Sequence, residues 1–175
     1  LGRSGIFALA ALFVPLALWL THPTVTGHAH AVTSVAFAPD GQYVLIGSLG
    51  NIARLWKTAT GREVRRFTGH TRSVWSVAFA PDGQYVLTGS TDNTARLWET
   101  ATGREVRQFT GHTRSVSSVA FAPDGRHLLT GGFDGTGRLW DTTTGSLVWT
   151  TPVPFWNEST WGWDDVIDRK STRLN

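Results

Sequence analysis

The chain has 175 residues, of which 41% are hydrophobic and 17% charged, and its formal net charge is +3. It contains no cysteine, which excludes disulfide scaffolds, thiolate metal sites and cysteine nucleophiles. The apolar fraction is too high for a disordered chain, so we expect a packed core. Because no Met occurs and the first residue is Leu1, we expect the sequence to be a truncated piece of a longer protein.

The N-terminal part, residues 1–26, is interpreted as a leader or anchor. Residues 6–20 read IFALAALFVPLALWL, an uncharged apolar run of fifteen residues. That length suits a signal-peptide core of about 7 to 15 residues and is short for spanning a bilayer. We expect a helical segment that contacts a membrane, in an anchored or exported protein. The alternative is a buried helix of an upstream domain in a cytoplasmic protein.

Three consecutive units of 42 residues fill the middle of the chain, at 27–68, 69–110 and 111–152. Each begins with Gly-His, contains SVAFAPDG and carries Arg-Leu-Trp near its end. Units 1 and 2 agree at 32 of 42 positions, and units 2 and 3 agree at 26 of 42. Such self-similarity at a fixed period indicates a repeat architecture.

Within a unit, the hydrophobic pattern predicts strands. In unit 2 the segments 74–80, 84–90, 94–100 and 104–110 are rich in β-branched and aromatic residues or alternate in polarity. Pro, Asp, Asn and Gly between them suit short hairpin turns. Each unit is therefore expected to be a four-stranded antiparallel sheet that stacks on its neighbours to bury its apolar faces.

These residues resemble the WD-repeat family of β-propellers, whose repeats of about 40 to 45 residues run from Gly-His to Trp-Asp. Only Trp140 is followed by Asp, at Asp141, whereas Trp56 precedes Lys57 and Trp98 precedes Glu99. The resemblance implies an all-β fold, a partial propeller of three four-stranded blades. Three blades do not close a ring, so either further blades are missing or several chains assemble. The near-identity of the units suggests recent duplication and a prokaryotic protein.

The resemblance also implies a buried hydrogen-bonded quartet of His, Ser or Thr, Asp and Trp in each blade. In unit 2 it consists of His70, Thr88, Asp92 and Trp98, and in unit 3 of His112, Thr130, Asp134 and Trp140. Unit 1 has His28 and Trp56, but Ile46 and Gly50 occupy the hydroxyl and carboxylate positions. We expect a degenerate first quartet and a weaker first blade.

A Thr, His and Asp in one unit could be mistaken for a catalytic triad. Because the set recurs at fixed spacing in two units, we interpret it as structural, and we predict no catalytic residue, no cofactor and no enzyme activity. His28 and His30 have no third ligand nearby in the sequence, so we predict no metal site.

The positions that vary between otherwise matching units indicate where a partner binds. They are Thr33, Trp75 and Ser117 at the start of the first strand, and Leu49, Thr91 and Phe133 before the turn Asp position. The resemblance places both sets on the top face around the central channel, where protein or peptide partners dock. Exposed aromatic residues are enriched in binding hot spots. The alternative is neutral drift, with Trp75 merely packing on a neighbouring blade.

We therefore predict a non-catalytic protein–protein interaction scaffold. One alternative is a regulatory or sensory part of a larger enzyme, such as a kinase or protease. A weaker one is an extracellular glycan-binding module that uses Trp75 together with Trp156, Trp161 and Trp163. The repeated arginines, among them Arg62, Arg65 and Arg66, are interpreted as a solvated edge, and the alternative is a basic rim for anionic partners.

The C-terminal part does not continue the repeat. Residues 153–167 form a Trp-rich extension, and residues 168–175 read DRKSTRLN, which resembles the translation of a common sequencing adapter. We interpret the latter as an artefact. Without its three basic residues and one acid, the net charge falls from +3 to +1, so no nucleic-acid partner is expected.

Overall fold

The structure is a computed structural model that describes residues 30–151. Twelve β-strands and no helix occur in this part of the chain. The strands are β1 (Val32–Phe37), β2 (Tyr43–Ser48), β3 (Ile52–Lys57), β4 (Arg62–Thr68), β5 (Val74–Phe79), β6 (Tyr85–Ser90), β7 (Ala95–Glu99), β8 (Glu105–Phe109), β9 (Val116–Phe121), β10 (His127–Gly132), β11 (Gly137–Asp141) and β12 (Leu147–Thr150).

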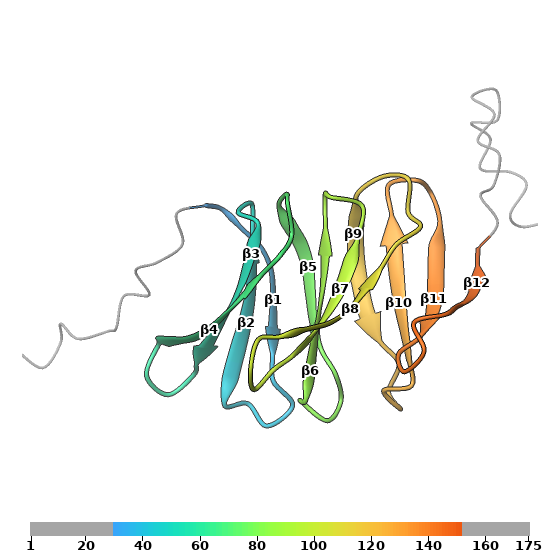
Figure 1. Cartoon of the computed structure of the whole chain (residues 1–175). Coiled ribbons are helices and arrows are strands. Elements are labelled where there is room, and N and C mark those ends of the chain that lie inside the picture. Colours follow the sequence, from blue (N-terminus) through green and yellow to red (C-terminus); the bar gives the residue numbers. More distant parts are fainter. Residues whose placement is uncertain (1–29, 152–175) are drawn as a thin grey trace, which may run out of the picture.

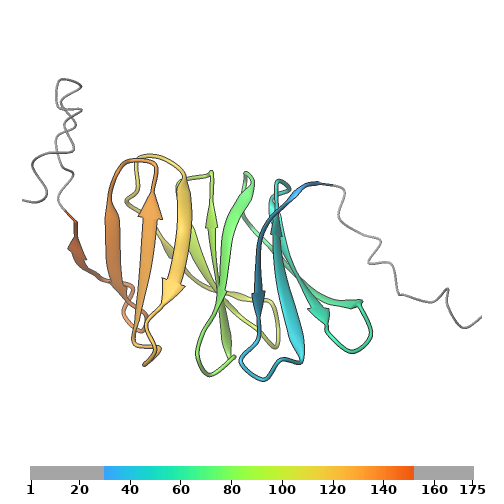
Figure 2. The same ribbon diagram turned by 180° about the vertical axis from the view of Figure 1, so that it is seen from behind.

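The strands form three separate four-stranded sheets, each made of four consecutive strands. We call them blade 1 (β1–β4), blade 2 (β5–β8) and blade 3 (β9–β12). All neighbouring strands are antiparallel. The blades stand side by side in chain order, as Figure 1 shows, and the view from behind shows the same order (Figure 2). The predicted all-β fold with four-stranded antiparallel blades is confirmed.

The tight turns follow from local chemistry. In the turn between β5 and β6, the Asp82 carboxylate accepts a hydrogen bond from the backbone N–H of Gln84 at 2.9 Å, and the Gly83 N–H donates to the Ala80 carbonyl. Gly83 has φ +72°, a conformation that costs glycine little. Because a Pro-Asp-Gly sequence occurs at the same place in every unit, the same hairpin turn recurs in all three blades.

Alternating strand direction divides the connections between two sides of the molecule. The turns β2–β3, β6–β7 and β10–β11 lie on one side with the links that lead from one blade to the next. This side is uppermost in Figure 1, and we call it the top face. The turns within the Pro-Asp-Gly hairpins lie on the opposite side. Residues that vary between the units at these turns and links are therefore brought to one face.

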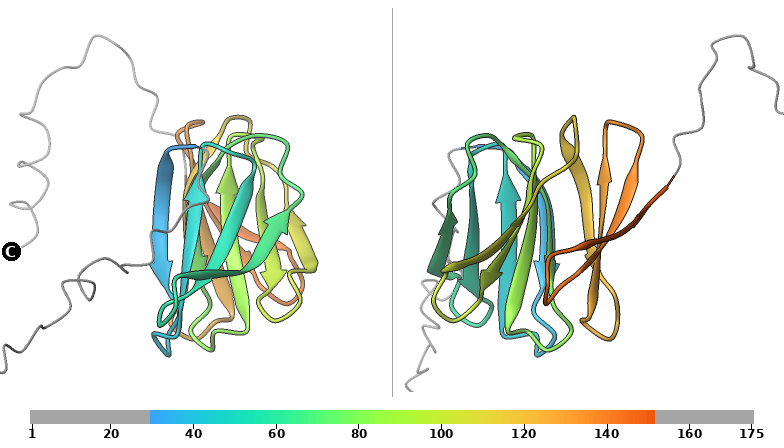
Figure 3. Two further views of the ribbon diagram at one scale, coloured as in Figure 1. Left: turned by 90° about the vertical axis from the view of Figure 1, so that its left-hand side faces the viewer. Right: turned by 45° about the vertical axis from the view of Figure 1, so that its right-hand side comes forward.

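The core consists of two seams between blades. Each blade has a trailing face, which packs on the blade that follows, and a leading face, which packs on the blade before. In the first seam, Leu45, Ala53, Leu55 and Phe67 of blade 1 meet Val74, Val77, Val86 and Trp98 of blade 2. The second seam repeats these positions with Leu87, Ala95, Leu97, Phe109, Val116, Val119, Leu128 and Trp140. Figure 3 shows the blades stacked face to face.

Aromatic pairs anchor both seams. The ring centroids of Phe67 and Trp98 lie 6.0 Å apart, and those of Phe109 and Trp140 lie 5.6 Å apart. All four side chains are buried. Because large aromatic side chains contribute much of the apolar area of a core, these pairs account for a substantial share of the energy that holds neighbouring blades together.

Several predictions from the sequence fall on residues outside 30–151, and the structure does not describe them. They are the apolar segment 6–20, His28, the Trp-rich extension 153–167 and the adapter-like segment 168–175. Within residues 30–151, no helix is long and apolar enough to cross a membrane.

Candidate functional site

The quartet of blade 2 forms a continuous chain of hydrogen bonds. His70 Nδ1 lies 2.8 Å from the Asp92 carboxylate, and His70 Nε2 lies 2.7 Å from Thr88 Oγ1. The indole N–H of Trp98 donates to the same hydroxyl oxygen at 2.9 Å. A carboxylate only accepts, so Nδ1 carries the proton, and in the neutral imidazole Nε2 accepts from the Thr88 hydroxyl. Every polar atom of the chain then has a partner.

Blade 3 repeats this geometry 42 residues later. His112 Nδ1 lies 2.9 Å from the Asp134 carboxylate, and His112 Nε2 lies 2.8 Å from Thr130 Oγ1. The Trp140 N–H donates to Thr130 Oγ1 at 2.9 Å. Both threonines are fully buried, at 0% exposure. No substrate reaches a hydroxyl at such a position, so this Thr-His-Asp arrangement performs a structural role and not nucleophilic chemistry.

The carboxylates of the two quartets are held ionised. Burial disfavours the charge on Asp92, but hydrogen bonds from His70, Thr94 and the Thr71 backbone outweigh it and hold the pKa of Asp92 well below its ordinary value. Burial likewise opposes the charge on Asp134, whose pKa is lowered by hydrogen bonds that come first from Thr136. Each carboxylate therefore remains a charged acceptor that ties the interblade link to the turn above it.

Blade 1 lacks these groups. Ile46 and Gly50 occupy the places of Thr88 and Asp92, and His28 lies outside the described residues. Beside Gly50 lies the side chain of His30 instead: a Cβ built on Gly50 would be 3.3 Å from His30 Nδ1. No carboxylate therefore ties the chain to the β2–β3 turn at this position of blade 1.

An exposed aromatic pair lies on the top face between blades 2 and 3. Trp75, at the start of β5, and Phe133, in the β10–β11 turn, meet edge to face with ring centroids 5.4 Å apart. Trp75 is 36% exposed and Phe133 is 55% exposed. The sequence singled out both residues separately, and the structure brings them together into one apolar platform.

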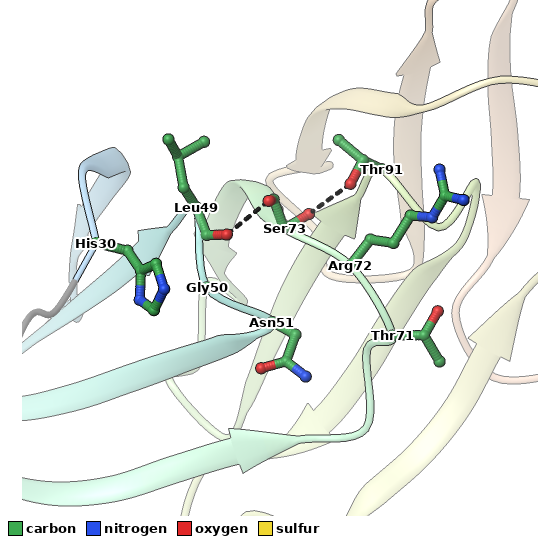
Figure 4. A pocket seen from close by; sticks show the side chains of 8 residues that line it. All are labelled: His30, Leu49, Gly50, Asn51, Thr71, Arg72, Ser73 and Thr91. Carbon is green, nitrogen blue, oxygen red and sulfur yellow. Dashed lines mark hydrogen bonds between the residues drawn. The ribbon is translucent and has the colours of Figure 1, made fainter.

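Two more of the six candidate positions line a hollow at the seam between blades 1 and 2. Leu49 and Thr91 stand on either side of Ser73, as Figure 4 shows. The Ser73 hydroxyl donates to the Leu49 carbonyl at 2.6 Å, and the Thr91 hydroxyl donates to the Ser73 carbonyl at 3.4 Å. The remaining lining residues are His30, Gly50, Asn51, Thr71 and Arg72.

The hollow is open, polar and weakly basic, with a volume of about 410 Å³. Its eight lining residues include Arg72 and His30 and no carboxylate. The sequence analysis considered His30 only as a possible metal ligand, and it missed Arg72. A sequence signal for this basic hollow was present, because Gly50 replaces the turn Asp and removes the negative charge that the other blades carry at this position.

The last two candidate positions bond to backbone carbonyls, Thr33 across the first seam and Ser117 within blade 3. The Thr33 hydroxyl donates to the Val74 carbonyl at 2.6 Å, and the Ser117 hydroxyl donates to the Gly131 carbonyl at 3.2 Å. Both side chains are half-buried. They hold inner strands in place, and the structure gives them no direct link to the aromatic platform.

Most arginines of the outer strands are engaged within the protein. Arg66 forms an ion pair with Glu63, and Arg104 lies 3.7 Å from Glu99. Arg65 donates to the Thr102 carbonyl of the next blade at 3.0 Å. These contacts favour the interpretation of a solvated edge over a basic rim for anionic partners. Residues 30–151 hold no cluster of three or more His, Cys, Asp or Glu side chains that could bind a metal ion.

Comparison with known proteins places this fold in a family. The profile of the WD domain, G-beta repeat, matches residues 21–57, 61–99 and 103–141, which together make up more than half of the chain. The chain belongs to the WD-repeat family. Each match of this WD-repeat profile ends with the third strand of a blade. The second and third matches begin at the fourth strand of the preceding blade. A WD repeat and a blade are therefore offset by one strand.

This chain spans less than half of the length of the similar proteins. The cross-pathway control WD-repeat protein 2 of Flammulina velutipes is 44% identical over 43 residues, which are 25% of this chain and 14% of that protein. The solved structure of U3-55K superposes with a TM-score of 0.70 at 24% identity, covering 73% of this chain and 41% of that one. The RRP9 WD40 repeats give a TM-score of 0.70 at 24% identity, covering 72% and 40%. These structures support the propeller fold.

Proposed function

We propose that this WD-repeat protein is a non-catalytic interaction scaffold that captures a peptide segment of a protein partner on its top face. The observation that carries the proposal is the pairing of Trp75 with Phe133, because two exposed aromatic rings in contact form an apolar anchor. Other blades carry Thr or Ser at the position of Trp75, and Leu or Thr at the position of Phe133, so no blade requires an aromatic ring there for folding.

The hollow between blades 1 and 2 supports a preference for acidic peptides. It lies on the same face as the platform, and Arg72 and His30 line it without a carboxylate among its lining residues. A Glu or Asp side chain of a bound peptide would meet favourable potential there. The aromatic platform would hold an apolar side chain of the same segment.

The test selects peptides from a random library on the immobilised full chain and measures their affinity for variants. Trp75→Ser introduces the residue that blade 3 has at this position, and Phe133→Thr introduces the residue of blade 2. Both changes are therefore compatible with the fold. We expect each to weaken selected peptides by about tenfold or more, since truncating a hot-spot residue costs about 2 kcal/mol or more. Unchanged affinity in both variants would refute the platform.

Matched control variants test whether the loss of affinity is specific to the top face. Val106→Thr removes an exposed apolar residue of the outer strand β8 and should leave affinity unchanged. Arg72→Gln should weaken acidic peptides, and the loss should shrink as salt is added. Arg126→Gln removes an exposed arginine on the opposite face and should have no effect.

A further inference from the structure

The outer end of blade 1 carries an arrangement of charge that blade 2 does not have. Lys57, at the end of β3, and Arg62, at the start of β4, lie directly opposite each other in the sheet. The corresponding residues of blade 2 are Glu99 and Arg104, whose charged groups approach to 3.7 Å. Blade 1 therefore has two like charges where blade 2 has an ion pair, and directly opposed like charges destabilise a sheet.

Neither cation of this pair is compensated within the part of the chain that the structure describes. Most outer-strand arginines are engaged in ion pairs or hydrogen bonds, but no ion pair of residues 30–151 includes Lys57 or Arg62. Both residues are exposed to solvent. An anion bound between them would convert a repulsive pair into an attractive site.

An apolar hollow of about 290 Å³ lies beside this pair, between the outer strand of blade 1 and the β7–β8 turn of blade 2. Its lining is mostly apolar and consists of Tyr43, Leu55, Val64, Arg65, Thr100 and Ala101. Val64 is 44% exposed and also borders a second hollow, whose other lining residues are Lys57, Thr60, Arg62 and Glu63. We call the combined lining of the two hollows the outer-end surface.

The outer-end surface is basic, and it lies away from the top face. Its one carboxylate is already paired within blade 1, because Glu63 forms ion pairs with Arg54, at 3.0 Å, and with Arg66. The β3–β4 turn, which Lys57 and Arg62 flank, is on the lower side of the molecule in Figure 1. The surface is therefore separate from the aromatic platform and from the polar hollow of the top face.

We propose that the outer-end surface of blade 1 is a further docking site, which binds an acidic segment of a protein partner. Carboxylates of the segment contact Lys57 and Arg62, and an aliphatic side chain beside them fills the hollow at Val64. Charge complementarity selects an acidic partner. The apolar hollow selects a protein segment over a nucleic acid, because a nucleic-acid backbone presents phosphates and sugars and no aliphatic group that could fill it.

The experiment records nitrogen–proton correlation NMR spectra of the full chain during titration with synthetic peptides. The first peptide has glutamates on both sides of a single leucine, and the second has glutamines in place of the glutamates. We expect the first to shift the amide signals around Lys57, Val64 and Ala101 in a saturable manner. The second should bind at least about fivefold more weakly, since an exposed ion pair contributes up to about 1 kcal/mol. Because each amide is observed separately, binding at this surface is distinguished from binding on the top face.

Three variants identify the groups that bind. Lys57→Glu introduces the residue that blade 2 has at this position, so the fold accepts it. It should weaken the glutamate peptide by about fivefold or more and raise the melting temperature, because it replaces the repulsive pair with an attractive one. Val64→Thr should weaken this peptide but not a version that has serine in place of leucine. Arg126→Glu reverses an exposed charge in the β9–β10 turn of blade 3 and should change the affinity by less than about twofold.

Two results would overturn the proposal directly. They are amide shifts confined to other surfaces, and an affinity for the glutamate peptide that Lys57→Glu leaves unchanged. The class of partner is tested with duplex DNA and with vesicles of three parts phosphatidylcholine to one part phosphatidylserine. If either perturbs the same amides at a lower concentration than the glutamate peptide does, the partner is a nucleic acid or a membrane, and the assignment of a protein segment is wrong.

Discussion

Blade 1 and blade 2 have nearly the same sequence, with 32 of 42 positions identical, yet only blade 2 has the Thr and Asp of the quartet. Both nevertheless form a four-stranded sheet with the same strand register. Val35 pairs with Ile46 in blade 1, and Val77 pairs with Thr88 in blade 2. The sheet therefore arises from the strand pattern and the hairpin turns, and the quartet is not required to form it.

The quartet instead fixes how the chain enters a blade. In blade 2, Asp92 accepts hydrogen bonds from His70 and from the Thr71 backbone, so the interblade link is fastened to the β6–β7 turn. The β2–β3 turn of blade 1 is held from outside. There the Ser73 hydroxyl donates to the Leu49 carbonyl, and the Val74 N–H donates to the Gly50 carbonyl at 3.0 Å. The following blade supplies both donors.

The largest effect on the difference between blades 1 and 2 is expected from removing the hydroxyl at the centre of the quartet. Thr88→Val leaves His70 and the Trp98 N–H without their shared partner in a buried site. Each unsatisfied buried group costs about 1 to 3 kcal/mol, so the free energy of unfolding should fall by about 2 to 6 kcal/mol. Urea denaturation followed by Trp fluorescence measures the change.

Blade 1 supplies the control for this substitution. Ile46→Val alters the same position without removing a hydroxyl, and it should cost about 0.5 to 1.5 kcal/mol, the usual cost of deleting one methylene. A loss at position 88 no larger than the loss at position 46 would contradict the expected contribution of the Thr88 hydrogen bonds.

Removing the carboxylate of the quartet should have a smaller effect. Asp92→Ala leaves His70 Nδ1 and the Thr71 N–H without their acceptor, and part of this site is open to water. We expect a loss of about 1 to 3 kcal/mol. Asp82→Ala, which removes an exposed turn carboxylate bonded to the Gln84 N–H, should cost less than about 1 kcal/mol. Thermal melts of the two variants decide between a quartet-specific and a general charge effect.

The sequence allowed the blades to be predicted because each is specified locally. The period of 42 residues, the Pro-Asp-Gly turns and the alternating strands are all short-range signals. The quartet residues were expected from the resemblance to WD repeats, and the fixed spacing related their positions in one unit to those in the next. Contacts between blades could not be predicted in this way, because they join residues far apart in the chain, such as Phe67 and Trp98, and no pattern in the sequence reveals the pairing.

The candidate site illustrates that limit. Variation between units singled out Trp75 and Phe133, but nothing in the sequence shows that their rings meet across a seam. Thr33 and Ser117 satisfied the same criterion, but their hydroxyls bond to backbone carbonyls, that of Thr33 across the first seam and that of Ser117 within blade 3. Arg72 was overlooked because it occupies a position where blade 3 also has an arginine, and only the replacement of Asp by Gly50 gives the hollow its basic character.

The response to acid tests how the two quartet carboxylates contribute. The pKa of Asp92 is below its ordinary value in the folded protein, so between the two values the unfolded chain binds more protons than the folded one. Stability is therefore fully present above the ordinary carboxyl range and is lost as the pH falls from about 5 toward the depressed pKa. Asp92→Asn should flatten this decline, and urea titrations at several pH values measure it. Asp82→Asn should leave the decline nearly as steep, and identical curves for both variants would contradict the assignment.

The smallest effect is expected from giving blade 1 the carboxylate that it lacks. Gly50→Asp should place a carboxylate beside His30, since a Cβ at position 50 would lie 3.3 Å from His30 Nδ1 and 3.3 Å from Ser48 Oγ. His30 is exposed, so the gain over Gly50→Ala should not exceed about 1 kcal/mol and should shrink with added salt. Gly50→Ala is the proper reference because it shares the loss of glycine's chain entropy without adding charge. Chemical denaturation of the two variants at low and high salt compares them. If Gly50→Asp proves less stable than Gly50→Ala, the carboxylate of blade 2 depends on the complete His-Thr-Trp arrangement around it and cannot be transplanted alone.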